Sequence, residues 1–200
     1  MADEIKSTLE LALEKAEKLG KASKEELELM ELREKAQKLG AKFLKNEIEN
    51  FEEALNELLQ NKSSSQRKEI IKNIVEVFLK NINLPWFEYQ IEDSKKALEG
   101  LACIFKNIPE ISRLTQEIER LLKEYYNHKE AIYNELKSRF EGGLEELEKN
   151  LSAQLGAEVK INIEEHPQFR EEWRKIKEKL DEEYEKHLNY LKELFKKIVA

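Results

Sequence analysis

The chain has 200 residues, of which 38% are charged, and carries a formal net charge of -7 with only 6 Gly and 3 Pro. This composition favours long helices joined by few turns. The apolar core should then be a narrow strip between helices instead of a globular centre. Because basic residues are interleaved with acids, the acidic balance argues against nucleic-acid partners, which require clustered Lys and Arg. No apolar stretch is long enough for a membrane span or a signal peptide. We therefore expect a cytoplasmic protein without membrane contacts.

Residues 1–62 are predicted to form an N-terminal helical arm. One helix is expected over residues 3–20 and a second over residues 23–58, where Ser23 and a glutamate three residues later match a capping box. The apolar stripe of the second helix shifts by one position at Gly40, which indicates a drifting seam or a bend. These stripes have no evident cover within the chain, so we expect self-association to supply one.

Residues 66–106 are predicted to be apolar central helices. A polar, serine-rich linker at residues 61–65 precedes them. Apolar residues at positions 70–82 spread around much of a helix instead of keeping to one stripe. This pattern predicts burial on several sides and places the centre of the core here.

The stretch that follows the first central helix admits two interpretations. Phe87, Tyr89 and Ile91 alternate as in a strand, yet they also fit the apolar stripe of a helix. Proline is favoured in the first turn of a helix, and the helical pattern after Pro85 runs unbroken to Phe105. The helix is therefore the favoured interpretation.

Residues 109–200 are predicted to form a long antiparallel helical hairpin. Pro109 opens its first helix, Gly156 ends it, and Pro167 opens the second. If the centre of the connector sets the register, residues 132–144 should face residues 177–188 in the opposite direction.

The connector of this hairpin carries an alternating apolar pattern. Val159, Ile161 and Ile163 would form one face of a short strand near residues 158–164. A lone strand leaves its hydrogen-bonding edges unpaired. We therefore expect it to pair with residues 87–91 or with the same stretch of a second chain.

Catalytic, cofactor and metal sites are not indicated. A di-metal helical bundle requires Glu three residues before His, but Tyr or Ile stands at that position before His128, His166 and His187. No glycine-rich phosphate loop or Ser-His-Asp context occurs. The only cysteine, Cys103, has apolar neighbours that predict a buried thiol. We therefore assign no catalytic, cofactor or metal residues and do not expect an enzyme.

Adjacent aromatic residues give the better hint of function. Trp86, Phe87 and Tyr89 follow Pro85 so closely that one helix cannot bury all three on a narrow stripe. Core packing is one explanation, and contact with a partner is the other. Together with the connector, they make up the candidate interaction residues Trp86, Phe87, Tyr89, Val159, Ile161 and Ile163.

The chain resembles an uncharacterised bacterial protein family of unknown function. The resemblance rests on EIKSTLELALEK at residues 4–15, ALEGL at 97–101, VKI at 159–161, HPQF at 166–169 and EW at 172–173. It extends over most of the chain and implies that residues 1–200 form one unit. It brings no activity or catalytic residue.

These patterns together predict an all-α, elongated protein with at most one short strand. The function that fits best is a non-catalytic cytoplasmic scaffold or adaptor that contacts itself or another protein through helical faces. The alternative is a helical-bundle enzyme or metal-binding protein.

Overall fold

The computed structural model describes residues 24–158 and 160–199, and this part of the chain is almost entirely helical. Its elements are α2 (Lys24–Leu44), α3 (Phe51–Leu59), α4 (Ser64–Lys80), α5 (Tyr89–Ile104), α6 (Pro109–Leu155), the 3-10 helix η1 (Ile163–Glu165) and α7 (Pro167–Val199). No strand occurs within these ranges, so the all-α prediction is confirmed. The helix expected over residues 3–20 and the cap at Ser23 lie outside the described residues.

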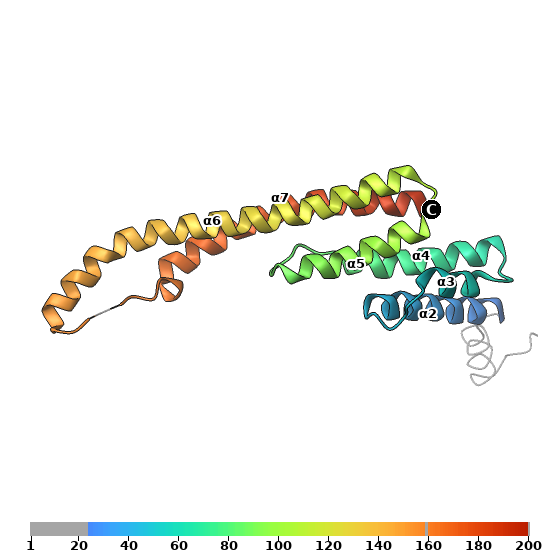
Figure 1. Ribbon diagram of the computed structural model, residues 1–200, viewed down its shortest axis with the longest axis horizontal. Coiled ribbons are helices and arrows are strands. Elements are labelled where there is room, and N and C mark those ends of the chain that lie inside the picture. The colour runs from blue at the N-terminus through green and yellow to red at the C-terminus, as the bar shows by residue number, and fades with distance from the viewer. Residues whose placement is uncertain (1–23, 159, 200) are drawn as a thin grey trace, which may run out of the picture.

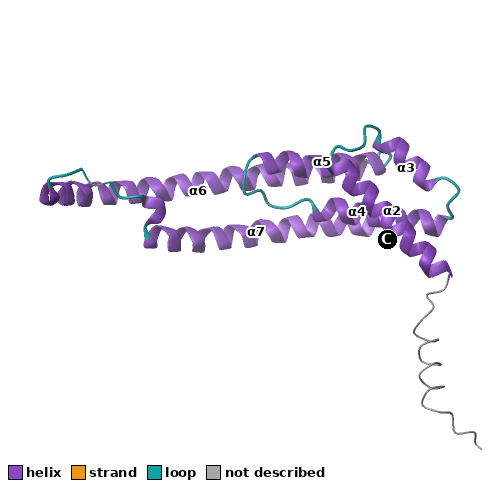
Figure 2. Ribbon diagram, turned by 90° about the horizontal axis from the view of Figure 1, so that it is seen from below, coloured by secondary structure: helices purple, strands orange, loops and turns teal. Residues whose placement is uncertain are grey.

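The molecule consists of a helical body and a projecting arm. In the body, α2 to α5 pack together with the first part of α6 and the last part of α7 (Figure 1). The rest of α6 and α7 extends away from the body as an antiparallel pair, which a second view also shows (Figure 2). The elongated shape is as predicted. None of the described helices is long and apolar enough to cross a membrane.

Three aromatic rings and one glycine form the centre of the body. Phe43 of α2, Phe51 of α3 and Phe78 of α4 lie with ring centroids 4.6–5.6 Å apart. α5 meets them at Gly100, where an added Cβ would lie 2.5 Å from the Phe78 ring and 2.9 Å from the Phe43 ring. The contact between α5 and α4 therefore depends on a residue without a side chain.

The apolar stripe of α2 is covered within the chain, contrary to the expectation that self-association would cover it. Leu32 and Ala36 are buried, and α2 packs along α4. Gly40 does not break the helix, since α2 continues through it to Leu44. Because Gly40 has no side chain, α2 can pack closely against Val77 of α4 there. Among the described apolar residues of α2, only Leu27 and Met30 are exposed.

The predicted second helix is divided in two. α2 ends at Leu44, and Asn46 then adopts a positive φ of 57°, a backbone region that asparagine tolerates better than most residues. Asn50 caps α3 by accepting a hydrogen bond from the Glu53 amide. The break falls between Leu44 and Phe51, so the prediction of one continuous helix over residues 23–58, with a drifting seam or a bend at Gly40, was wrong.

The start of α4 matches its prediction. Ser63 accepts a hydrogen bond from the Gln66 amide, and the Gln66 side chain accepts one from the Ser63 amide, which completes a capping box. Burial on several sides is also confirmed, because Ile70, Val75 and Phe78 are all buried although they point in different directions around the helix.

The hairpin forms as predicted, but its register differs. Pro109 and Pro167 open α6 and α7, and Gly156 caps α6 in the left-handed region with φ 63°. However, Phe140 packs on Phe169 with ring centroids 5.4 Å apart, not on residues near 181.

The shift in register amounts to about three to four helical turns. Tyr133 packs on Trp173 and His128 lies beside the Tyr184 hydroxyl, whereas the prediction placed residues near 188 and 193 there. The chain causes this shift by running back along α6 after Gly156, with the Ile161 amide donating to Glu148. α7 therefore begins well short of the end of α6 (Figure 1).

Two glycine substitutions should have opposite effects. Gly100→Ala should lower the free energy of unfolding by about 1–3 kcal/mol, because its methyl group must displace the Phe78 and Phe43 rings. Gly142→Ala is the matched control, since an added Cβ there meets nothing within 4 Å. It should raise stability by about 0.5–1 kcal/mol through helix propensity. Urea unfolding measures both, and equal effects of the two variants would contradict the packing at Gly100.

Candidate interaction surface

The chain between α4 and α5 presents three exposed aromatic rings, which we call the aromatic turn (residues 85–89). Trp86, Phe87 and Tyr89 are 63%, 58% and 63% exposed, whereas Pro85 is fully buried. Phe87 and Tyr89 stack almost parallel, with an interplanar angle of 9°. The proline thus anchors the turn while the rings face solvent.

The helix after this turn begins later than predicted. α5 starts at Tyr89 instead of Pro85, and Glu88 provides no side-chain cap. Instead, the Gln90 side-chain oxygen accepts hydrogen bonds from the amides of Trp86 at 2.6 Å and Phe87 at 3.1 Å. The favoured helix interpretation is therefore confirmed from Tyr89 on, but its start at Pro85 was wrong, because a side chain within α5 satisfies these amides without a further helical turn.

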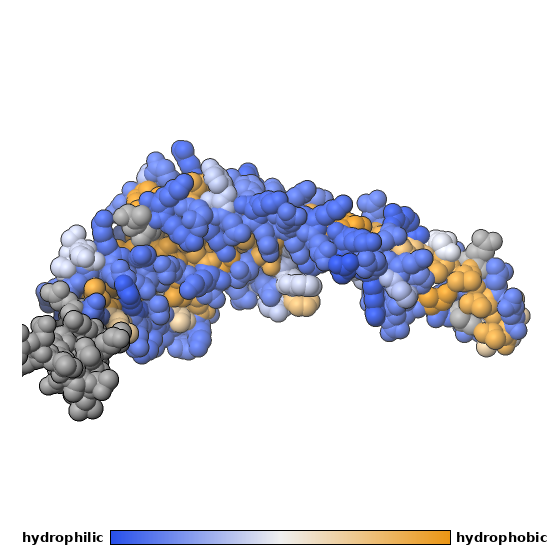
Figure 3. All heavy atoms as spheres, turned by 180° about the vertical axis from the view of Figure 1, so that it is seen from behind, coloured by the Kyte–Doolittle hydropathy of each residue, from blue (hydrophilic) through white to orange (hydrophobic). Residues whose placement is uncertain are grey.

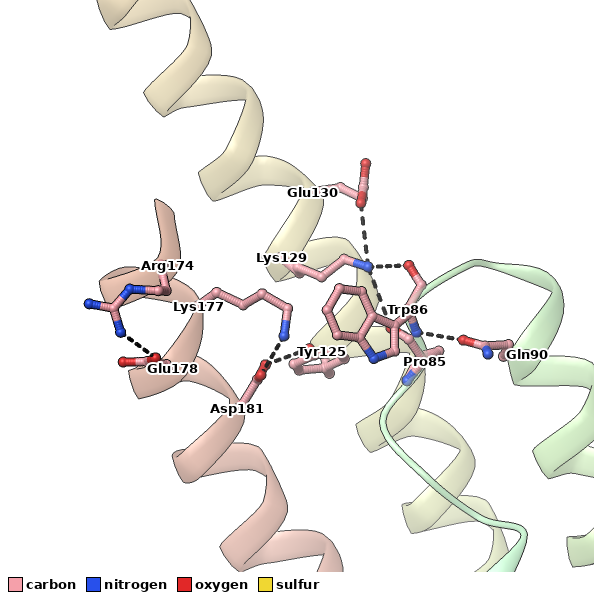
Figure 4. Close-up of polar contacts among 10 residues, drawn as sticks. All are labelled: Pro85, Trp86, Gln90, Tyr125, Lys129, Glu130, Arg174, Lys177, Glu178 and Asp181. Carbon is pink, nitrogen blue, oxygen red and sulfur yellow. Dashed lines mark hydrogen bonds and ion pairs between the residues drawn. The ribbon is translucent and has the colours of Figure 1, made fainter. Parts of the chain in front are cut away.

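Lys129 of α6 holds the turn from the other side (Figure 4). Its side chain is only 6% exposed, and its ammonium group donates to the Trp86 carbonyl at 2.5 Å and to the Pro85 carbonyl at 3.4 Å. Glu130 lies 3.6 Å away and supplies partial charge compensation. Burial lowers the pKa of Lys129, and the Glu130 carboxylate opposes that effect. A buried cation is therefore used to fix backbone carbonyls of the turn.

α7 contacts the turn through Lys177. Its ammonium group lies 4.1 Å from the centre of the Trp86 ring, which is within the range of a cation-π interaction. The Asp181 carboxylate binds Lys177 at 2.5 Å and accepts a hydrogen bond from the Tyr125 hydroxyl at 2.6 Å. Figure 4 shows these groups converging from the turn, α6 and α7. The indole ring is thus held against the hairpin while most of it stays exposed.

A cavity of about 580 Å³ lies next to Trp86. Its walls are mostly polar and carry side-chain amides together with charges of both signs, among them Gln90, Asp93, Lys177 and Lys192. Burial, and then the charge of Lys196, lower the pKa of Lys192. Such a lining suits polar side chains of a partner that packs on the aromatic turn.

The predicted connector residues lie elsewhere. Val159 is outside the described residues, and Ile161 and Ile163 are half-buried in the segment that runs back along α6. Ile163 starts η1, which is helical, so the expected strand is absent from the described part of residues 158–164. The expected pairing with residues 87–91 is also wrong, because those residues enter α5. The two candidate groups therefore form separate surfaces.

The histidines are not brought together. His128 lies 3.4 Å from the Tyr184 hydroxyl, His187 lies 3.9 Å from Glu117, and the His166 ring packs on Phe140. Within residues 24–158 and 160–199, no group of three or more His, Cys, Asp or Glu side chains could hold a metal ion. Cys103 is half-buried, and burial followed by the charge of Glu52 raises its pKa, which disfavours a reactive thiolate.

Comparison with known proteins gives one match. The model of a family of unknown function, DUF6657, matches residues 56–197, so the chain belongs to that family. The matched range contains the aromatic turn and the whole hairpin except for its last residues, while α2 precedes it. No curated protein and no solved structure matches the chain.

The Lys129→Met substitution should loosen the aromatic turn. It leaves the Pro85 and Trp86 carbonyls without their buried donor, which should cost about 1–3 kcal/mol of unfolding free energy. Iodide quenching of Trp86 should rise in a Trp173→Phe background. Lys123→Met, which removes an exposed ion pair with Glu119, is the control and should cost much less than Lys129→Met. Equal costs would refute the role given to Lys129.

The Tyr125→Phe substitution should remove a pH-dependent contribution to stability. Burial, and then the hydrogen bond to Asp181, raise the pKa of Tyr125 in the folded state. A raised pKa stabilises the fold below the ordinary tyrosine pKa of about 10, and this contribution is lost as the pH rises above it. The wild type should therefore lose more stability than Tyr125→Phe between roughly pH 9 and 11. Tyr190→Phe, at a residue 61% exposed, should behave as the wild type in thermal unfolding.

Proposed function

We propose that this member of a family of unknown function is a non-catalytic cytoplasmic scaffold or adaptor. It acts through protein contacts made by its helical faces, and the aromatic turn is its main contact with a second copy of the chain. The observation that carries this proposal is the exposure of Trp86, Phe87 and Tyr89 on a turn that is fixed from two sides.

The energetics of binding support this role for the turn. Aromatic residues are enriched at the centres of protein interfaces, where large rings lose much water-exposed area at a small cost in conformational freedom. Here Lys129 and Gln90 already fix the backbone, so little further ordering is required on binding. Stacking of Phe87 on Tyr89 gives a joint aromatic surface, while Trp86 lines the polar cavity.

A second copy is the favoured partner at this surface because both charge signs meet there. Lys192 and Asp93 line the cavity next to Trp86, and Glu88 is exposed nearby in the chain. A two-fold arrangement can place the cation of one copy near the carboxylates of the other, while the rings pack at the centre. The alternative function, a helical-bundle enzyme or metal-binding protein, would instead give stoichiometric metal in the purified protein.

Light scattering after size exclusion, over a range of concentrations, tests the proposal. The wild type should form an oligomer, and Trp86→Ser, Phe87→Ser and Tyr89→Ser combined should raise its dissociation constant at least about tenfold. Leu27→Ser combined with Met30→Ser is the control at another exposed apolar site and should leave the constant unchanged. A wild type that is monomeric at every concentration, or that contains one metal ion per chain, would overturn the proposal.

A further inference from the structure

Within residues 24–158 and 160–199, no helix packs beside the end of α6. α7 begins at Pro167 next to Phe140, whereas α6 continues to Leu155. We call residues 142–155 the α6 tip, and Figure 1 shows it projecting beyond α7 at the end of the arm. The hairpin register, rather than the local sequence, leaves this segment uncovered.

The α6 tip carries an apolar stripe of helical spacing. Leu144, Leu147, Leu151 and Leu155 follow one another at intervals of three and four residues, so they share one face. Leu147 is 46% and Leu155 is 67% exposed, and a space-filling view shows hydrophobic atoms gathered at this end of the arm (Figure 3). This stripe resembles the face of a helix that packs against another helix.

The segment that runs back from Gly156 contacts the tip, where Leu144 and Leu151 are half-buried but Leu147 and Leu155 stay exposed. It is attached on one side of the tip, where the Ile161 amide donates a hydrogen bond to the Glu148 carboxylate at 2.7 Å. Glu148 comes four residues after Leu144 and three before Leu151, so it shares their face, and the open part of the stripe is the part with Leu147 and Leu155. At Gly142 and Gly143 an added Cβ would meet nothing within 4 Å, so another helix can approach the backbone closely there.

Charge identifies the kind of partner. Residues 141–155 contain four Glu and only one Lys, so the tip is acidic. A second copy packed on the same stripe would bring two such segments together, and like charges at that separation repel. A helix with Lys or Arg beside its apolar stripe would instead pair with these carboxylates.

We propose that the α6 tip is a docking site for a basic amphipathic helix of another protein. The stripe from Leu144 to Leu155 is about 17 Å long at roughly 1.5 Å per residue, so it accommodates about three turns of a partner helix. The leucines supply the apolar contact, and the glutamates beside them select Lys and Arg. This surface is distinct from the aromatic turn, because Leu147 lies about 27 Å along α6 from Lys129.

Fluorescence anisotropy with the full chain and two synthetic peptides tests this proposal. Both peptides are 16-residue helices with leucines at the same spacing as the tip, and they differ only in having Lys or Glu beside the leucines. The Lys peptide should bind at least about tenfold more tightly than the Glu peptide, and less tightly as salt is raised from about 50 to 500 mM.

Variants then locate the binding site. Leu147→Ser combined with Leu155→Ser should weaken binding of the Lys peptide at least about tenfold, with helicity unchanged in circular dichroism because both side chains are exposed. Leu27→Ser combined with Met30→Ser should bind as the wild type. The triple variant of the aromatic turn should also bind as the wild type, so failure of the proposed self-association would leave this result intact.

Three outcomes would overturn the proposal. Equal binding of the Lys peptide to the wild type and the Leu147→Ser, Leu155→Ser variant would mean general attraction to an acidic protein. Equal binding of the Lys and Glu peptides would remove the charge argument. An oligomer of the wild type that dissociates only in the Leu147→Ser, Leu155→Ser variant would show that the tip binds a second copy.

Discussion

The register between α6 and α7 is the constraint on which both proposed surfaces depend. Edge-to-face contacts fix it, with Tyr133 on Trp173 and Phe140 on Phe169. The same register brings Asp181 to the Tyr125 hydroxyl and Lys177 to the ring of Trp86. At the other end it starts α7 beside Phe140, so α7 does not extend along the α6 tip. If α7 were shifted along α6 by one helical turn, Lys177 would move away from the Trp86 indole, and the length of the tip would change at the same time.

Local features of this fold could be predicted from the sequence, because they satisfy backbone groups within a few residues. Ser63 caps α4, Pro109 and Pro167 open helices, and Gly156 ends one, each by a mechanism that needs no distant contact. The register could not be predicted in this way. It depends on the path of the connector, which is held by a hydrogen bond from the Ile161 amide to the Glu148 carboxylate. No sequence pattern predicts that contact.

The aromatic turn shows the same division between local and distant information. Adjacent aromatic residues at 86, 87 and 89 cannot all face one side of a helix, but the sequence alone left core packing and contact with a partner both open. Their rigid presentation does not follow, because Lys129 comes from more than 40 residues away and stands in an ordinary charged run. Pro85 was also misleading, since a proline that is favoured at a helix start is equally suited to a buried turn.

The two surfaces are stabilised differently, and this difference bears on how they bind. The aromatic turn is ordered before binding, because Gln90 and Lys129 occupy its backbone groups, so most of the energy from burying its rings can appear as affinity. Among the described residues, no helix packs on the α6 tip, so part of the binding energy there must hold its last turns helical. Charge attraction compensates for this by speeding encounter and selecting a basic partner. Because the surfaces are separated along one stiff helix, occupation of one need not exclude the other, and the hairpin can connect two copies of the chain to a third protein.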